Sequence, residues 1–170
     1  NVAMIGLGFG AEFIPIYQDH PDASVYAICR RNEAELHKTG DQFQIEKRYT
    51  NYDDVLADPA VDYVHINSPI DDHAWMSLKA LDAGKHVLCE KPMALTSDGC
   101  RRIIAACEAA DVHLQVCFVL RGWPIYQRLR TMMTDGSIGR FVSARAHLAK
   151  WMPWDDGSWR RDVSQSGGGV

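Results

Sequence analysis

The sequence predicts an α/β fold built on a doubly wound parallel sheet. Short apolar runs typical of strands alternate with segments of helical apolar spacing as far as residue 118. A glycine-rich turn separates the first run from the first helical segment. The alternation changes near residues 121–124, where we predict that a second domain begins.

The first βαβ unit occupies roughly the first forty residues. Residues 2–5 form a predicted strand that ends at glycines, and residues 12–17 follow as a helix with Pro15 in its first turns. Residues 25–29 repeat the strand pattern. Asn32 is a predicted cap for a helix over residues 33–40, with Gly40 as its end.

The alternation continues through the middle of the chain. We predict a helical turn over residues 53–57, a strand over 61–66, and a helix over 71–83 that Gly84 closes. Residues 86–89 form the next strand. Residues 96–98 offer a cap to a helix that reaches Ala110, and residues 112–118 complete the sheet as its sixth strand.

The last fifty residues have a different pattern. Residues 125–134 are predicted as helix and Asp135-Gly136 as a turn, and residues 141–150 alternate like a strand with one polar face. The predicted domains are therefore residues 1–120 and residues 121–170, the second being the incomplete start of an α/β domain. The abrupt beginning and the final Gly-Gly-Gly-Val lead us to expect a piece of a longer protein.

Composition narrows the classes of function. The 170 residues are 46% hydrophobic and 24% charged, which is typical of a soluble globular domain. The net charge is -4 without a basic run, so we predict neither nucleic-acid nor membrane partners. No apolar stretch reaches the ~20 residues of a membrane span, and no leader precedes Val2, so we expect a cytoplasmic protein. The five cysteines lack a C-x-x-C pair and are predicted to be reduced and mostly buried, with no metal site.

The turn after the first strand reads Gly6-Leu7-Gly8-Phe9-Gly10-Ala11, which fits the G-x-G-x-x-A fingerprint of an NAD(P)-binding Rossmann fold. Gly6 permits the tight turn, and Gly8 lets the backbone approach a pyrophosphate. Ala11 lets the helix pack on the sheet while its amide groups face the phosphates. We predict that this turn binds a nicotinamide dinucleotide.

The end of the second strand favours NADP over NAD. In the NAD form of such a site, an acidic residue at this point accepts hydrogen bonds from the ribose. This chain has Arg30 and Arg31 instead, and Arg30 lies 20 positions after Gly10. Paired guanidinium groups suit the 2'-phosphate of NADP. NAD is the alternative cofactor, since a solvated arginine pair beside a helix start is the competing interpretation.

Lys91 is the predicted catalytic residue. It follows a strand directly, between Glu90 and Pro92, and ligands of open α/β sheets bind beyond the carboxyl ends of the strands. Oxidation of an alcohol needs a group that takes the hydroxyl proton, and a lysine beside a cationic nicotinamide is suited to that role. The alternative is a surface ion pair between Glu90 and Lys91.

The chain resembles the Gfo/Idh/MocA oxidoreductases. The resemblance depends on Gly6-Leu7-Gly8, on residues 52–56 and 61–62, on Ser68-Pro69 with His73, on the string 84–92 and on residues 136–139. It implies that residues 1–120 are a dinucleotide-binding Rossmann domain. Residues 121–170 would begin a C-terminal substrate and oligomerisation domain, so we expect a homo-oligomer of the full-length protein and a sugar, cyclitol or polyol substrate.

The resemblance also implies site residues. Lys91 belongs to the catalytic site in such proteins, and the expected cofactor contacts beyond the glycine turn and the arginine pair are Asn67, Ser68, Pro69, His73, Glu90, Lys91, Arg121, Trp159 and Arg160. The chain has Val119 where relatives often have Asn. The Asp and His that act with the lysine would lie beyond Val170.

Three functions follow as alternatives. The first is an NAD(P)-dependent dehydrogenase or reductase that transfers hydride between nicotinamide and a hydroxyl or carbonyl carbon. The second is an NAD-dependent glycoside hydrolase or lyase of the same fold. The third is a non-catalytic dinucleotide-binding module. Arg30 and Arg31 favour the first over the second, because an enzyme that recycles its cofactor internally has no need of NADP.

Overall fold

Six parallel strands form a single sheet in the order β3-β2-β1-β4-β5-β6. The computed structural model describes residues 1–140, 142–145, 147 and 162–167. This strand order, with two halves wound outward from β1 and β4, is that of a dinucleotide-binding α/β sheet. The predicted fold class is thus confirmed. The strands are β1 (Val2–Ile5), β2 (Val25–Cys29), β3 (Lys47–Tyr49), β4 (Tyr63–Ile66), β5 (His86–Cys89) and β6 (Leu114–Val116).

The helices between the strands begin at the caps that the sequence offers. The side chains of Asn32, Asn51 and Thr96 each accept a backbone N–H of the helix that follows. None of the helices in the described part of the chain is long and apolar enough to cross a bilayer. The helices are η1 (Gly10–Phe13), α1 (Ile14–Gln18), α2 (Glu33–Gln42), α3 (Tyr52–Ala57), α4 (Ile70–Asp82), α5 (Ser97–Ala110) and the short α8 (Val163–Ser166).

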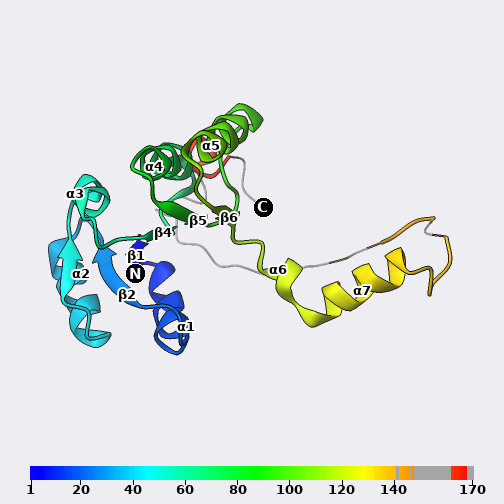
Figure 1. Ribbon diagram of the computed structural model, residues 1–170, viewed down its shortest axis with the longest axis horizontal. Helices are drawn as coiled ribbons and strands as arrows, with labels where there is room; N and C mark the ends of the chain where they lie inside the picture. The colour runs from blue at the N-terminus through cyan, green and yellow to red at the C-terminus, as the bar shows by residue number, and fades with distance from the viewer. Residues whose placement is uncertain (141, 146, 148–161, 168–170) are drawn as a thin grey trace. The chain divides into compact units, whose positions relative to one another are not determined.

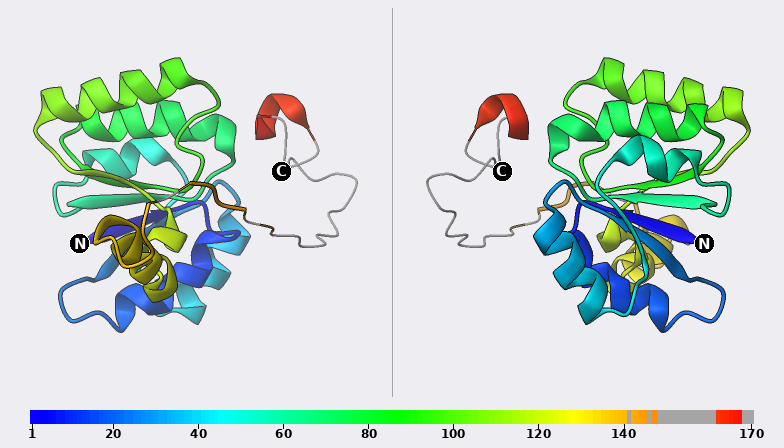
Figure 2. Two further views of the ribbon diagram at one scale, coloured as in Figure 1. Left: turned by 90° about the vertical axis from the view of Figure 1, so that its right-hand side faces the viewer. Right: turned by 90° about the vertical axis from the view of Figure 1, so that its left-hand side faces the viewer.

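Helices cover both faces of the sheet (Figures 1 and 2). One core joins α1 and α2 to the sheet through residues such as Ile14, Leu36 and Met4. The other core joins α3, α4 and α5 to the opposite face, with Ile66 and Ile103 fully buried in it. Burial on both faces explains why the central strands are continuous apolar runs rather than alternating ones.

A buried lysine ties the loop before β4 to the start of β5. Lys85 is 9% exposed, and its Nζ donates to the carbonyl oxygens of Asp58 at 2.9 Å and of Val61 at 2.7 Å. These bonds compensate the ammonium group for the water that it loses on burial. Lys85 is therefore a structural residue, although it lies only six positions before Lys91.

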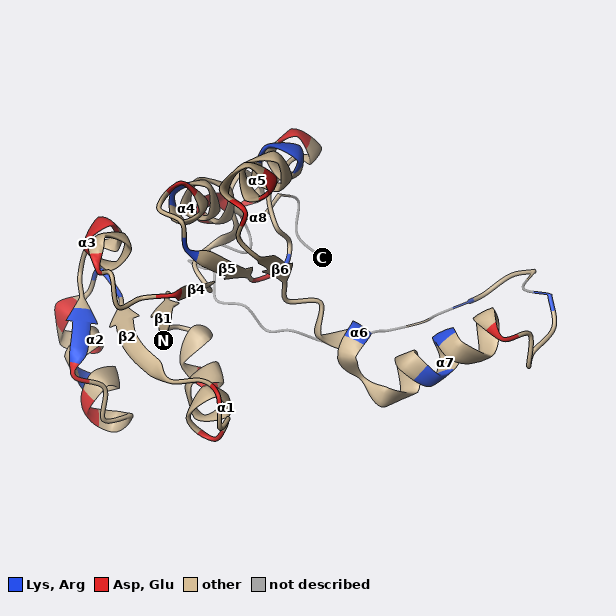
Figure 3. Ribbon diagram, in the orientation of Figure 1, with Lys and Arg blue, Asp and Glu red and all other residues tan. Residues whose placement is uncertain are grey.

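Basic and acidic residues lie near one another on the helices that cover the sheet. Figure 3 shows Lys or Arg beside Asp or Glu on α4 and α5. The described ion pairs include Arg48 with Asp41 at 2.8 Å and Lys79 with Asp53 at 2.7 Å, in which the acidic partners are well exposed. Exposed pairs of this kind contribute up to about 1 kcal/mol each, so the fold depends mainly on the two cores.

The chain divides into two compact units. The first comprises residues 1–117 and 159–170, and the second comprises residues 118–158. Within the second unit the structure describes α6 (Val119–Gly122) and α7 (Pro124–Thr134), and α7 agrees with the predicted helix over residues 125–134. The predicted division into domains at residue 121 stays a prediction.

The predicted strand over residues 141–150 does not form in the residues described. Residues 142–145 and 147 have no regular secondary structure, and the other residues of that range lie outside the described part of the chain. A strand needs a neighbour that accepts and donates its backbone hydrogen bonds. The described residues of the second unit include no second strand that could serve.

Two details of the first unit differ from the sequence prediction. The sequence indicated a sheet of six strands, but only five of them were assigned to residues. The sixth is β3, an edge strand, whose sequence Lys-Arg-Tyr contains no apolar run. The helix α2 also continues past Gly40 to Gln42. Gly40 is buried where a Cβ would meet the side chain of Arg48, so it provides close packing rather than a helix end.

Candidate dinucleotide-binding site

The glycine turn lies directly against the loop that follows β4. Gly6 has a φ of +81°, and a Cβ there would lie 2.8 Å from backbone atoms of Asn67 and Ser68. A Cβ on Gly10 would lie 2.9 Å from Cβ of Asn67. Gly8 is exposed, and a Cβ there would have nothing within 4 Å. The turn thus packs through Gly6 and Gly10 and leaves the backbone at Gly8 open to a ligand.

The helix after the turn begins as a 3₁₀ helix. The four residues of η1 start at Gly10, and the α-helix proper starts only at Ile14 with Pro15 in its first turn. Ala11 packs against the core that contains Ile14, as the fingerprint predicts for its third small residue. Leu7 is buried at 3% exposure, whereas Phe9 is 57% exposed and its ring packs edge-on against Phe13 at 5.3 Å.

The two arginines stand at the carboxyl end of β2. The backbone N–H of Arg30 donates to the carbonyl of Tyr49 on β3, which fixes the main chain at this point. The Arg30 side chain is 32% exposed, and its Nη1 lies 3.7 Å from the Glu35 carboxylate. Arg31 is exposed. This end of β2 therefore carries two guanidinium groups, of which Glu35 pairs with one.

The loop after β4 contains two buried polar atoms without partners. Among the described atoms, neither Oδ1 of Asn67 nor Oγ of Ser68 has a hydrogen-bond partner. The backbone of Asn67 is held by its N–H bond to the Ile5 carbonyl at 2.8 Å, and its Nδ2 donates to the His65 carbonyl. Buried polar atoms are nearly always satisfied in native proteins. Atoms left free beside an open glycine turn fit a polar ligand such as a dinucleotide.

These segments enclose one cavity of about 690 Å³, a size typical of small-molecule sites. It brings together the turn from Gly6 to Phe9, the arginine pair and the loop of Asn67, Ser68 and Pro69. Burial raises the pKa of the Cys29 thiol in this cavity to about 12, so the thiol is protonated near neutral pH and is no nucleophile. The lining also includes residues that the sequence did not indicate as site residues, namely Ile5, Cys29, Asn32, Thr50, Asn51, Tyr52, Asp72, Trp75 and Met76.

Two of the missed residues had a signal in the sequence. Tyr52 begins α3 after the two residues that follow β3, and Trp75 lies on the second turn of α4, so both are near carboxyl ends of strands. Their rings pack edge-on at 5.9 Å, and Trp75 Nε1 donates to the Asp72 carboxylate at 2.7 Å. Trp75 could have been found by considering the residues one turn into each helix that follows a strand. Tyr52 could be found in this way only if the strand β3 before it had been predicted.

His73 is buried at 1% exposure and joins two loops. Its Nε2 lies 2.8 Å from the Ser68 carbonyl oxygen, and its Nδ1 lies 2.7 Å from the Pro92 carbonyl oxygen. Both ring nitrogens are thus occupied by the protein. His73 thus supports the segments that carry Ser68 and Lys91, and its contact with a cofactor stays a prediction.

Glu90 and Lys91 follow β5 directly, and neither is among the residues that line the cavity. Glu90 is 8% exposed, and its Oε2 accepts the backbone N–H of Lys91 at 3.1 Å. The Lys91 side chain is exposed. In the described part of the chain no salt bridge joins Lys91 Nζ to Glu90, so the ion pair considered as an alternative does not form there. The ammonium group is available to a ligand.

The other predicted contacts are Arg121, Trp159 and Arg160. Arg121 belongs to the second unit, on α6, where its guanidinium lies 4.4 Å from the ring centre of Phe118. Its role toward a cofactor stays a prediction. Trp159 and Arg160 lie outside the described residues.

Comparisons with known proteins identify the family of the chain. Residues 1–118 match the family model described as "Oxidoreductase family, NAD-binding Rossmann fold". A 1,5-anhydro-D-fructose reductase from Ensifer adhaerens is 36% identical over 74% of the chain and 38% of the relative. A D-xylose 1-dehydrogenase (NADP(+)) from Haloferax volcanii is 33% identical over 85% of the chain and 44% of the relative.

The structural comparison gives the same fold. The WlbA dehydrogenase from Bordetella pertussis, solved with NADH and UDP-GlcNAcA, aligns with a TM-score of 0.76 at 27% identity, over 82% of this chain and 43% of that one. The chain thus spans less than half the length of these proteins. The cofactors named among them include both NADP(+) and NADH.

Proposed function

Because the chain belongs to the Gfo/Idh/MocA oxidoreductase family, whose members have an NAD-binding Rossmann fold, we propose that it is the cofactor-binding part of an NADP-preferring dehydrogenase or reductase. The reaction transfers hydride between nicotinamide and a hydroxyl or carbonyl carbon. The substrate is a sugar, a cyclitol or a related polyol. The names of the Ensifer and Haloferax relatives support that substrate class.

The observation that carries the cofactor proposal is the arginine pair on the cavity. Arg30 and Arg31 line the same cavity as the glycine turn, where an NAD site has an acidic residue. A guanidinium forms forked, charge-assisted hydrogen bonds with phosphate oxygens. The ion pair of Arg30 with Glu35 is long, at 3.7 Å, so a 2'-phosphate is the stronger partner for Arg30.

The turn and the loop after β4 bind the rest of the dinucleotide. The backbone at Gly8 approaches the pyrophosphate, and Asn67 and Ser68 supply the two free polar atoms. Leu7, Phe9, Gly10, Ala11 and Pro69 shape this surface. We assign His73 a positioning role, because its two nitrogens hold the loops of Ser68 and Pro92.

Lys91 handles the proton of the reaction. A bound nicotinamide supplies the hydride acceptor or donor. The exposed Lys91 ammonium lies at the carboxyl end of β5, where it can give a proton to a carbonyl oxygen or, when neutral, take one from a hydroxyl. Glu90 fixes the start of this segment through its bond to the Lys91 N–H.

We also propose a cytoplasmic location and a homo-oligomeric full-length protein. The five cysteines are all free thiols, which is typical of a reducing compartment. The oligomer follows from the family resemblance and is tested by light scattering of the eluted full-length protein, where a monomer mass would reject it.

The function is tested by incubating the full-length protein with NADP⁺ or NAD⁺ and a panel of aldoses, sugar acids, cyclitols and polyols. We expect net formation of reduced cofactor with at least one compound and a tighter dissociation constant for NADP⁺ than for NAD⁺. Turnover of a glycoside without net reduction of added cofactor would favour the hydrolase or lyase instead. Equal affinities for the two cofactors would reject the role of the arginine pair.

A further inference from the structure

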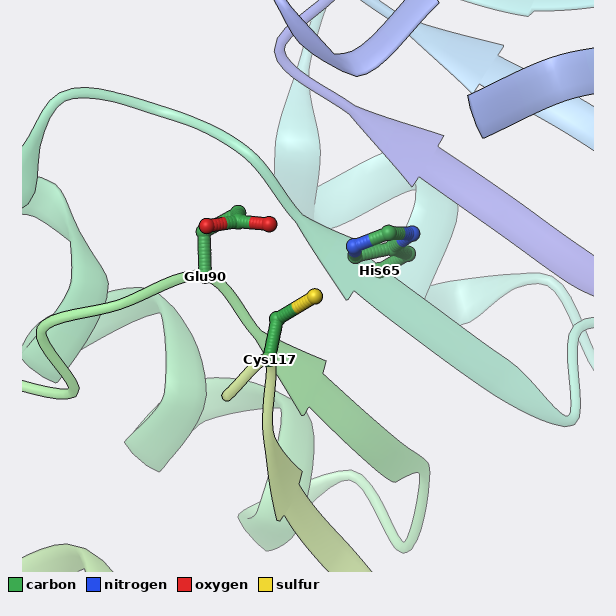
Figure 4. A group of neighbouring side chains, drawn as sticks. All are labelled: His65, Glu90 and Cys117. Atoms are coloured by element: carbon green, nitrogen blue, oxygen red, sulfur yellow. The ribbon is translucent and has the colours of Figure 1, made fainter. Parts of the chain in front are cut away.

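Three side chains of types that bind metals converge at the carboxyl ends of β4, β5 and β6. Figure 4 shows His65 on β4 with Glu90 and Cys117, which follow β5 and β6 directly, and their side chains point toward one another. One ligand atom from each residue lies within 4.8 Å of the other two. We propose that His65, Glu90 and Cys117 form a binding site for one thiophilic divalent cation, of which Zn²⁺ is the example.

The register of the sheet explains the convergence. His65 pairs with Leu88, and Leu88 pairs with Gln115, so these three residues share one face of the sheet. Glu90 and Cys117 lie two positions after Leu88 and Gln115, which returns their side chains to that same face. The cluster therefore depends on the register of the strands that precede Glu90 and Cys117.

His65 supplies a free and buried ligand atom. The residue is 0% exposed, and its Nε2 has no hydrogen-bond partner among the described residues. Its Nδ1 lies 3.1 Å from the hydroxyl of Tyr17, and the rings of Phe13 and Tyr17 pack on it at 4.9 and 5.8 Å. When Nδ1–H donates to Tyr17, Nε2 presents its lone pair, which is the tautomer that a metal requires.

Binding of M²⁺ breaks the Cys117 S–H bond and releases that proton to solvent, while Nε2 of His65 and the Glu90 carboxylate donate lone pairs. No electron is transferred.

The identity of the cation follows from the ligands. One imidazole nitrogen, one carboxylate oxygen and one thiolate sulfur suit Zn²⁺ and disfavour Mg²⁺ and Ca²⁺, which prefer oxygen atoms alone. Bonds of about 2.0–2.3 Å place tetrahedral ligands roughly 3.5 Å apart. The ligand atoms of the cluster, which lie within 4.8 Å of one another, would have to move closer together around the ion, and water would complete the fourth position.

The three proposed ligands lie outside the lining of the dinucleotide cavity, although Glu90 directly precedes the predicted catalytic Lys91. None of the three residues lines the cavity of about 690 Å³, which ends at Asn67, Ser68 and Pro69 on this side. A metal ion here would instead join the ends of three neighbouring strands. Its binding is therefore measurable without cofactor or substrate.

The test is a titration of the chelator-treated protein with Zn²⁺ by calorimetry and with Co²⁺ by absorption. We expect one equivalent to bind, with a thiolate-to-cobalt charge-transfer band. Cys117→Ser should lose the band and bind Zn²⁺ at least about tenfold more weakly, and Tyr17→Phe should bind about 10- to 100-fold more weakly. The matched control is Cys107→Ser, a partly buried thiol on α5 that donates to the Val112 carbonyl. It should bind like the wild type.

Three results would overturn the site. They are absence of binding, a Co²⁺ spectrum without a thiolate band, and equal affinities of Cys117→Ser and Cys107→Ser. If circular dichroism shows that Cys117→Ser is unfolded, His65→Phe provides the same comparison, because phenylalanine keeps the ring packing on Phe13. Wild-type affinity in His65→Phe then rejects the proposal.

Discussion

His73 and Pro92 are linked by a contact of 2.7 Å between the histidine Nδ1 and the proline carbonyl oxygen. The same ring reaches the Ser68 carbonyl with Nε2, so one buried side chain sets the spacing of the loops after β4 and β5. Lys91 precedes Pro92 directly. The position of the predicted catalytic lysine relative to the cofactor loop therefore depends on a residue that need not touch either ligand.

Replacement of His73 should loosen both loops. His73→Phe keeps a buried ring but removes the N–H that donates to one of the two carbonyl oxygens, and we expect a loss of about 1–3 kcal/mol in the free energy of unfolding. Urea unfolding measures this. His113→Gln, at an exposed histidine, should stay within about 0.5 kcal/mol of the wild type. Equal stabilities of the two variants would contradict the linking role.

Two glycines of one turn should respond differently to the same methyl group. Gly6→Ala places a Cβ 2.8 Å from backbone atoms at a φ of +81°, so we expect a loss of about 2 kcal/mol or more in stability. Gly8→Ala meets nothing within 4 Å, so its stability should change by less than about 0.5 kcal/mol. It should nevertheless bind NADP at least about tenfold more weakly, because the methyl group occupies the approach to the pyrophosphate. Calorimetry measures the stability and the NADP affinity of both variants. A wild-type NADP affinity in Gly8→Ala would contradict the approach of the Gly8 backbone to the pyrophosphate.

The cofactor preference should reverse at Arg30. In Arg30→Asp, the carboxylate repels a 2'-phosphate and can accept hydrogen bonds from a ribose, so the NADP-to-NAD affinity ratio should fall about 10- to 100-fold. Fluorescence titration with each cofactor measures the ratio. Arg101→Asp, on the exposed surface of α5, is the charge-matched control and should leave the ratio unchanged. A ratio that falls equally in both variants would indicate a general effect of charge.

Turnover should depend on Lys91 more than cofactor binding does. Lys91→Ala should lower kcat of the full-length protein at least about 100-fold, because the proton loses its carrier, while the cofactor dissociation constant changes less than about threefold. Lys38→Ala, at an exposed lysine on α2, should affect neither quantity. If Lys91→Ala turns over normally, Lys91 is only a surface residue.

The decrease in the free energy of unfolding at acidic pH should depend on Asp58. Its carboxylate accepts the Tyr49 hydroxyl at 2.6 Å and the Tyr26 hydroxyl at 3.1 Å. The hydrogen bond from Tyr49 is the main cause that lowers the pKa of Asp58 in the folded state. The contribution to stability is therefore present above the unfolded pKa of about 4 and is lost as the pH falls through the folded value.

Asp58→Asn should accordingly be less stable than the wild type at pH 7 and lose less stability between pH 4 and pH 2. Urea unfolding across this range tests the slope. The control is Asp111→Asn, since Asp111 is exposed and asparagine tolerates its φ of 53°. A slope in Asp58→Asn as steep as that of the wild type would contradict the assignment.

The sequence predicted well those elements whose local pattern, an apolar run or a capping residue, matches their environment in the fold. The strands β1, β2 and β5 were located because both of their faces are covered, and Asn32 and Thr96 were recognised as caps. The strand β3 was not located, because an edge strand needs no apolar run. Gly40 was wrongly predicted as a helix end for a related reason. Its neighbour Arg48 is eight positions away in sequence and comes into contact with it only in the fold.

The same distinction applies to the site. The glycine turn, Arg30 and Ser68 are local features at strand ends, and the structure gathers them around one cavity. The contacts of His73, the packing of Trp75 on Tyr52 and the cluster at His65 join residues far apart in sequence. Such relationships follow from register and helix packing, which a single sequence does not encode locally.

The two lysines of the string from Gly84 to Pro92 differ in chemical accessibility. Lys85 has its ammonium group enclosed by two carbonyl oxygens, whereas the Lys91 side chain is exposed. An amine-acylating reagent will therefore label Lys91 rapidly in the native protein and Lys85 only after unfolding. Peptide mapping of the labelled chain thus measures two properties in one short peptide. Protection of Lys91 by NADP reports occupancy of the cofactor site, and labelling of Lys85 reports unfolding of the domain.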